Sequence, residues 1–221
     1  MARTELDLKL KGLMDDVLLM GSLVEKAVEK SVDALKRRDL ELSRKVVEED
    51  NIIDRMRQEI EEKSIQVIAT QEPVARDLRF IVAVLNIIVD LERMADHAEG
   101  NAKISLMMGD QPPLKPLIDI PRMAAKANEM LKNSLNALVA RDVGAARKVC
   151  ADDDEIDALY DQVYRELLTF MLKDPTTIDR ATHLLWVAHN LERVGDRATN
   201  IAERVVFLVT GKMTECGISK Y

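Results

Sequence analysis

The chain has 221 residues, of which 47% are hydrophobic, 32% are charged and only 3% are aromatic. This balance excludes a disordered chain and is typical of a folded protein rich in helix formers, with little material for sheets. The formal net charge of −7 argues against a general binder of nucleic acid or of anionic membranes.

The expected compartment is the cytoplasm. No signal peptide follows Met1, and Cys150 and Cys216 lack the spacing of a metal or redox motif, which favours a reducing environment. The longest apolar run, residues 80–89, is interrupted by Asn86 and is far shorter than the ~20 residues that span a bilayer. We therefore expect membrane association only through partners.

Apolar residues recur at helical spacing through the first half of the chain. They predict helices over residues 6–36, 40–69 and 74–108. Asp39 is a suitable N-cap for the second of these helices. Pro73 ends it and suits the start of the third.

A proline-rich segment, residues 110–120, lies at the midpoint and cannot be helix interior. The second half then repeats the first. Its helices are expected over residues 120–139, from the break at Arg141-Asp142 to about Leu172, and over residues 176–210. Gly211 is expected to cap the last of these helices at its C-terminus. Residues after this glycine are expected to fray. The prediction is an all-α fold of two tandem three-helix bundles, six long helices with pseudo-twofold repeat symmetry. The first repeat is 1–109, the linker 110–120 and the second repeat 121–221.

One motif occurs twice, 100 residues apart: Leu91-Glu92-Arg93-x-x-Asp96 and Leu191-Glu192-Arg193-x-x-Asp196. On a helix, residues four apart lie on one face, so each Glu stands beside its Asp and repels it. Both pairs continue the apolar stripe that faces the core. Carboxylates in that position must be paired, protonated or bound to metal.

A second acid pair precedes each motif, at Asp50 and Asp54 in the first half and at Asp153 and Asp157 in the second. Short connections make neighbouring helices antiparallel. The two acid pairs of a repeat lie at similar numbers of residues before and after the turn that joins their helices, so they are expected at the same level along the bundle. Each bundle is thus expected to gather four carboxylates. The two sets are Asp50, Asp54, Glu92 and Asp96, and Asp153, Asp157, Glu192 and Asp196.

Such an all-oxygen site suits hard cations such as Mg, Mn, Ca or ferric iron. His97 aligns with Arg197 and is therefore not a repeated ligand, while His183 and His189 have no counterpart in the first half. The alternative is a set of salt bridges to arginines or lysines, without metal.

The chain has no glycine-rich phosphate loop and no nucleophile motif. Di-iron bundle enzymes carry Glu-x-x-His on their helices, but the third residue after Glu92 is Ala95 and after Glu192 it is Gly195. We therefore interpret the protein as a non-enzyme. A metal-dependent carboxylate-site enzyme and a metal-free helical scaffold remain the alternatives.

Two three-helix repeats, each with Leu-Glu-Arg-x-x-Asp in its last helix, resemble the PhoU family over nearly the whole chain. The segments 75–79 and 190–203 are especially similar to it. The resemblance implies a cytoplasmic, metal-binding homodimer that regulates phosphate uptake and represses the phosphate-starvation response. Its implied partners are the ATPase subunit of the phosphate ABC transporter and a PhoR-type sensor histidine kinase.

The resemblance also implies multinuclear metal clusters, with iron first and Mg, Mn and Zn as alternatives. The implied ligands are Asp50, Asp54, Glu92, Asp96, Asp153, Asp157, Glu192 and Asp196, together with Asn200. In the first half Gly100 stands where Asn200 stands in the second, and Asn101 is displaced by one residue. The two sites are therefore not expected to have identical ligands.

Overall fold

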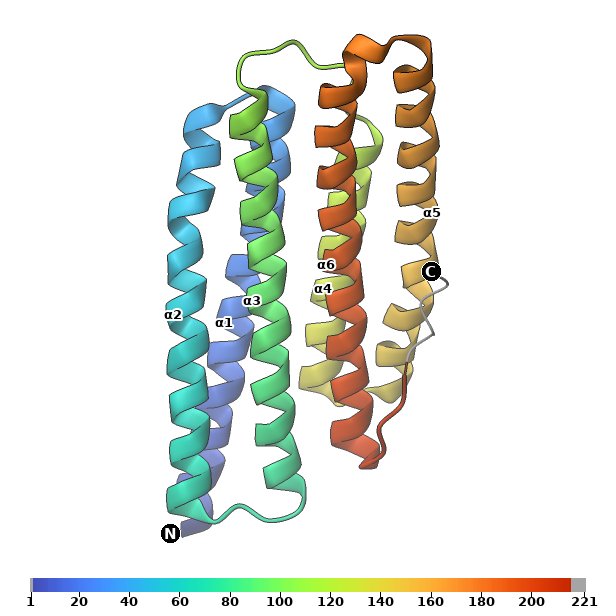
Figure 1. Cartoon of the computed structure of the whole chain (residues 1–221). Coiled ribbons are helices and arrows are strands. Elements are labelled where there is room, and N and C mark those ends of the chain that lie inside the picture. The colour runs from blue at the N-terminus through green and yellow to red at the C-terminus, as the bar shows by residue number, and fades with distance from the viewer. Residues whose placement is uncertain (1, 216–221) are drawn as a thin grey trace.

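A computed structural model describes residues 2–215 of the chain, which contain six long α-helices and, in the part described, no strands (Figure 1). The helices are α1 (Ala2–Arg37), α2 (Leu40–Gln71), α3 (Arg76–Met108), α4 (Asp119–Ala140), α5 (Val143–Lys173) and α6 (Ile178–Thr210), with a 3-10 turn η1 (Pro175–Thr177) before α6. The predicted all-α fold is confirmed. The fraying expected at the C-terminus falls partly on residues 216–221, which lie outside the described residues. No described helix is both long and apolar enough to cross a bilayer.

Equivalent turns begin the second helix of each half. Asp39 caps α2 as predicted, accepting a hydrogen bond from the Leu42 amide at 2.9 Å. Asp142 caps α5 in the same way, with the amides of Gly144 and Ala145 at 2.8 and 3.0 Å. The two halves therefore share the same aspartate N-cap at the start of their second helix as well as the same sequence pattern.

The start of the third helix was predicted wrongly. Pro73 lies in the loop, and α3 begins only at Arg76, after Ala75 with φ of 44°. Glu72 ends α2 in the left-handed conformation, which directs the chain away from the helix axis. Residues 73–75 are then needed to reverse the chain direction before α3 begins. In the second half, η1 similarly occupies the first residues of the expected sixth helix. At the other end of the chain Gly211 ends α6 with φ of 73°, as predicted.

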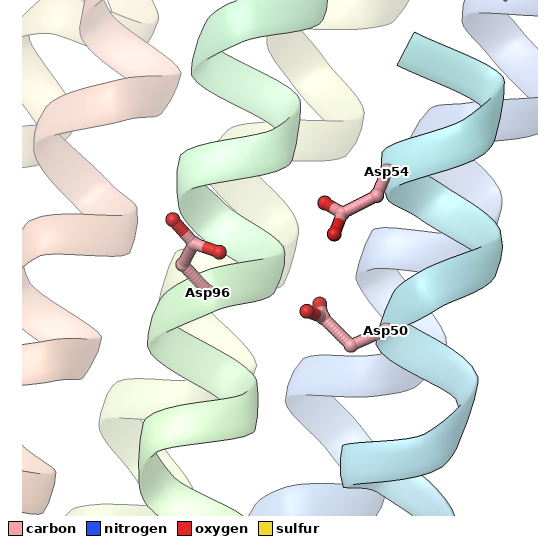
Figure 2. Close-up of side chains that lie close together, drawn as sticks. All are labelled: Asp50, Asp54 and Asp96. Carbon is pink, nitrogen blue, oxygen red and sulfur yellow. The ribbon is translucent and has the colours of Figure 1, made fainter. Parts of the chain in front are cut away.

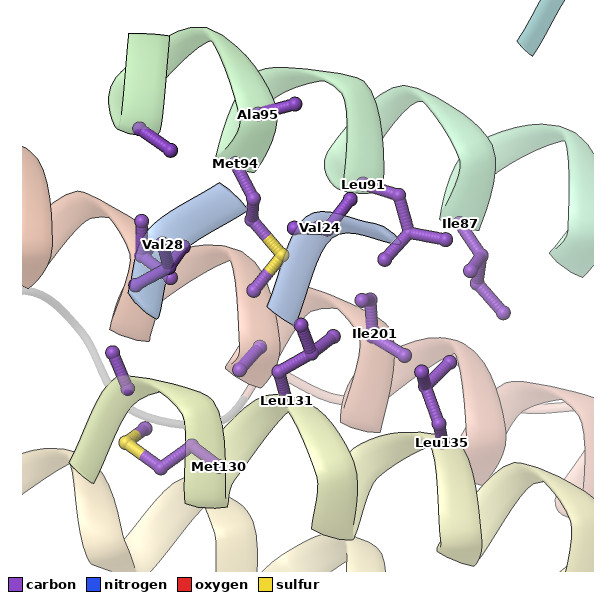
Figure 3. Packing of buried hydrophobic residues seen from close by; sticks show 14 of the residues in the cluster. Val24, Val28, Ile87, Leu91, Met94, Ala95, Met130, Leu131, Leu135 and Ile201 are labelled. Carbon is purple, nitrogen blue, oxygen red and sulfur yellow. The ribbon is translucent and has the colours of Figure 1, made fainter. Parts of the chain in front are cut away.

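The helices form two three-helix bundles that lie side by side. In Figure 1, α3 and α6 run next to each other at the centre, with α1 and α4 behind them. One apolar core continues through both bundles: Figure 3 shows Leu91 and Met94 of α3 together with Leu131 of α4 and Ile201 of α6. The two repeats therefore share their interior.

The connection between the halves is anchored by a buried lysine. Only 7% of the Lys115 side chain is exposed, and its ammonium pairs with Glu166 of α5 and lies 3.8 Å from an Asp119 carboxylate oxygen. A buried charge must be paired, so this contact holds the loop against α5. The division into 1–109, 110–120 and 121–221 stays a prediction.

A close approach of α1 to α4 explains Gly21. A Cβ at this position would come 2.3 Å from Leu135 Cδ1 on α4. We expect Gly21→Leu to lower the free energy of unfolding by about 1–3 kcal/mol, because the added side chain overpacks the interface. Gly12→Leu is the matched control: nothing lies within 4 Å of a Cβ at this position, so the same substitution should stabilise the helix by up to about 1 kcal/mol. Urea denaturation of both variants measures this, and equal effects would contradict the proposed close packing.

Candidate metal sites

The first cluster gathers three carboxylates at the interface of α2 and α3. Asp50 and Asp54 extend from α2 toward Asp96 on α3 (Figure 2), and their oxygens lie within 4.8 Å of one another. Within residues 2–215 this is the one group of three or more potential metal-binding side chains that meets at such distances. Several carboxylate oxygens converging on one point are the donor set that hard cations prefer.

Burial and repulsion from neighbouring acids raise the pKa of two acids of the first set, Asp50 and Glu92. Partial burial, followed by the charges of Asp54, Glu99 and Asp96, raises the pKa of Asp50 to about 7. Burial and then the charge of Asp96 raise the pKa of Glu92, a predicted ligand that lies outside the close group of three. Without a bound cation, the first cluster therefore reduces its negative charge by holding protons on Asp50 and Glu92.

The second predicted set, here called the second cluster, lies at the equivalent place between α5 and α6, but no three of its side chains converge as closely as Asp50, Asp54 and Asp96 do. Burial, followed by the charges of Asp157 and Asp196, raises the pKa of Asp153 to about 7. Burial and then Asp196 raise the pKa of Glu192 to about 7 as well. Asp153 Oδ1 is buried and accepts no hydrogen bond. An orphaned carboxylate oxygen beside three further acids is a position that a cation would satisfy.

Arginines neutralise part of each cluster. Arg193 Nη1 lies 2.7 Å from Asp196 Oδ2, and its Nε lies 3.1 Å from Glu192 Oε2. Arg93 pairs with Asp96 in the same way at 3.1 Å. The salt-bridge alternative is thus partly realised. However, both arginine side chains are about half exposed, so these pairs contribute only about 0–1 kcal/mol each. The arginines leave Asp153 Oδ1 without a hydrogen bond.

Asn200 lies at the contact between the two bundles. Its amide donates to Asp90 Oδ1 on α3 at 3.0 Å, and Arg197 Nη1 lies 3.5 Å from the same oxygen. The repeat-related contact joins Asn190 to Asn101, whose Oδ1 accepts at 2.9 Å. The displaced Asn101 therefore also serves the interface between α3 and α6. A ligand role for Asn200 stays a prediction.

The structure adds two residues that sequence reasoning did not select. Glu99 lies one turn beyond Asp96, and its charge helps to raise the pKa of Asp50. His189 lies one turn before Glu192, with Nδ1 3.5 Å from Glu192 Oε2. Helical spacing from the repeated motif could have selected both residues. It was used only for acids that occur in both halves of the chain, and so it missed them.

The raised pKa values make the stability of the metal-free protein depend on pH. Asp50 and Asp153 titrate near 7 when folded and near 3.8 when unfolded, so the folded state binds more protons between these values. Stability should therefore fall as the pH rises from about 4 through about 7. Thermal unfolding across this range measures the slope, and Asp50→Asn should flatten it. A variant slope identical to that of the parent would contradict the assignment.

A family model described as the PhoU domain matches residues 17–105 and 120–205. The "Phosphate-specific transport system accessory protein PhoU homolog" of Clostridium acetobutylicum is 38% identical, over 97% of this chain and 99% of that protein. The homologue of the same name from Caulobacter vibrioides is 42% identical over 92% and 89%, respectively. The crystal structure of PhoU from Pseudomonas aeruginosa is similar with a TM-score of 0.89 and 33% identity, covering 93% of this chain and 99% of that one. The crystal structure of the phosphate transport system regulatory protein PhoU from Streptococcus pneumoniae has a TM-score of 0.88 and a sequence identity of 30%. The match covers 95% of this chain and 99% of that chain.

Proposed function

This chain belongs to the PhoU family, and from that premise we propose that it regulates phosphate uptake and represses the phosphate-starvation response. The observation that carries the proposal is the match over nearly the full length of relatives named as accessory proteins of the phosphate-specific transport system. We propose that it acts in the cytoplasm as a homodimer, by contact with the transporter's ATPase subunit and a PhoR-type sensor histidine kinase.

We further propose that each carboxylate cluster holds a multinuclear metal centre, with iron first among the candidates. The close approach of Asp50, Asp54 and Asp96 and the orphaned oxygen of Asp153 support this proposal. Bound cations would supply positive charge that cancels the repulsion among the carboxylates. The acids on α2 and α3, and those on α5 and α6, would then hold neighbouring helices together through a shared ion.

A regulatory role is favoured over an enzymatic one. The relatives are named for accessory or regulatory roles, and the repeated motif has Ala95 and Gly195 where a di-iron enzyme carries histidine. A carboxylate-site enzyme predicts turnover of a phosphoester or of oxygen by the metal-loaded protein, and we expect none.

The test is deletion of the gene from its host. We expect alkaline phosphatase activity to become high in phosphate-rich medium, since the repressor of the starvation response is absent. The intact gene should restore low activity. Unchanged activity in the deletion strain would contradict the regulatory role.

A further inference from the structure

Cys150 of α5 is disulfide-bonded, and residues 2–215 contain no free cysteine. The chain has only two cysteines, and the second, Cys216, lies outside the described residues. Within one chain, Cys150 can therefore bond only to Cys216. The two are 216 − 150 = 66 positions apart, which explains why their spacing resembles no redox motif.

The arrangement of α5 and α6 brings the two cysteines within reach of each other. These helices are antiparallel neighbours joined only through η1, so the start of α5 and the end of α6 lie at the same end of the second bundle. Cys150 lies seven residues after the first residue of α5, which is about 10 Å along the helix axis. The five residues that follow Gly211 can span up to about 17 Å. Figure 1 shows the segment 211–215 leaving the end of α6 and turning back on the side of α5.

The other contacts of this segment are weak. Residues 211–215 are all exposed. The Lys212 amide donates to Thr210 Oγ1 at 3.1 Å, and Arg204 Nη1 lies 3.5 Å from Met213 Sδ. Solvent competes with such exposed hydrogen bonds, so each contributes little to holding the segment in place. A covalent bond to α5 would hold it far more firmly.

The site on α5 accommodates the reduced cysteine as well. The Cys150 side chain is partly buried against the apolar core, and its sulfur lies 3.4 Å from the Ala146 carbonyl oxygen. A thiol can donate a weak hydrogen bond to that oxygen, so opening the disulfide leaves the sulfur with a partner. The shift that superposes Asp50 on Asp153 puts Val47 at the place of Cys150, since 150 − 103 = 47. The first repeat therefore cannot form an equivalent bond.

We propose that Cys150 and Cys216 form a reversible disulfide that ties the residues after Gly211 to α5. Disulfides in a reducing compartment are usually transient and sense oxidation, so this bond would form when the thiol pool becomes oxidised. The inference concerns only the second repeat and does not depend on the proposed function or on metal binding.

The bond forms by thiol–disulfide exchange with a small-molecule disulfide such as oxidised glutathione. The Cys150 thiolate attacks the reagent and displaces one thiol, and the Cys216 thiolate then attacks the Cys150 sulfur and displaces the second. The two cysteines together lose two protons and two electrons. The S–S bond of the reagent is broken and accepts them as two thiols, so the exchange is balanced and an excess of reduced thiol reverses it.

The experiment treats the full-length protein with oxidised glutathione, in the presence of a chelator that keeps metal ions from oxidising thiols. Free thiols are then alkylated, and the protein is digested with trypsin and analysed by mass spectrometry without reduction. The parent should lose both alkylatable thiols, remain a single chain and yield peptide 149–165 joined to peptide 213–220. Dithiothreitol should restore both thiols. Cys216→Ser should yield no joined peptides, whereas the matched control Thr214→Ser, in the same exposed segment, should behave like the parent.

Thermal unfolding gives a second readout. The oxidised parent should unfold at a temperature about 5 °C or more above that of the reduced parent, because the bond closes a long loop in the unfolded chain. Cys216→Ser should unfold at the same temperature under both conditions. The proposal would be overturned if both parent thiols stayed alkylatable after oxidation, if they bonded only to glutathione or to a second copy of the chain, or if the bond formed without raising the unfolding temperature.

Discussion

Loading the stripped protein with a metal ion that both clusters accept is expected to raise its free energy of unfolding by about 2.7 kcal/mol per site at a free concentration 100 times Kd. The reason is linkage: a ligand that binds only the folded state stabilises that state. Asp50, Asp54 and Asp96 come together only through the packing of α2 against α3, so the unfolded chain has no equivalent site. Chemical denaturation with and without metal, Fe²⁺ under anaerobic conditions first, gives the difference.

The triple variant Asp50→Asn, Asp54→Asn and Asp96→Asn should lose the first site's share of this gain. Without metal it should be more stable than the parent at neutral pH, because neutral amides remove the repulsion that raises the pKa of Asp50. A matched control changes three exposed acids of α2, Glu48, Glu59 and Glu62, to Gln and should retain the full effect of metal. If metal leaves the parent's stability unchanged, the scaffold alternative is favoured, in which the acids serve only salt bridges.

The fold could be predicted because its signals are local. Helical periodicity, the capping aspartate Asp39 and the proline-rich segment each act within a few residues, and the repeat confirmed them twice. Errors arose where the backbone made an irregular turn, as at Ala75. Its φ is positive, and alanine gives no indication of such a conformation in the sequence. The requirement for glycine at Gly21 was also missed, because it comes from Leu135 on a helix more than a hundred residues away.

The candidate sites were predictable in part for the same reason. Spacing of i and i+4 with antiparallel helices selected the acids, and the close group of Asp50, Asp54 and Asp96 agrees with that selection. What could not be predicted depends on how the bundles pack together. The hydrogen bond from Asn200 to Asp90 joins α6 to α3, and only the contact of the two repeats brings these side chains together.

Leu91→Ala is expected to lower the free energy of unfolding by about 2–5 kcal/mol, because Leu91 is fully buried and its truncation leaves a cavity. Leu91 packs where the cores of the two bundles meet, near Leu131 and Ile201 (Figure 3). Because that core is continuous, the whole chain should unfold in one cooperative transition that shifts as a unit. The control Leu8→Ala removes a leucine that is 66% exposed and should change stability by no more than about 0.5 kcal/mol.

Urea denaturation followed by circular dichroism measures both variants. A second, unshifted transition in Leu91→Ala would mean that the repeats unfold independently, each stabilised by its own half of the core. A single shifted transition would mean that a change within one repeat is felt by the other. In that case an ion bound at either carboxylate cluster would stabilise the whole chain against unfolding, since both clusters would belong to one cooperative unit.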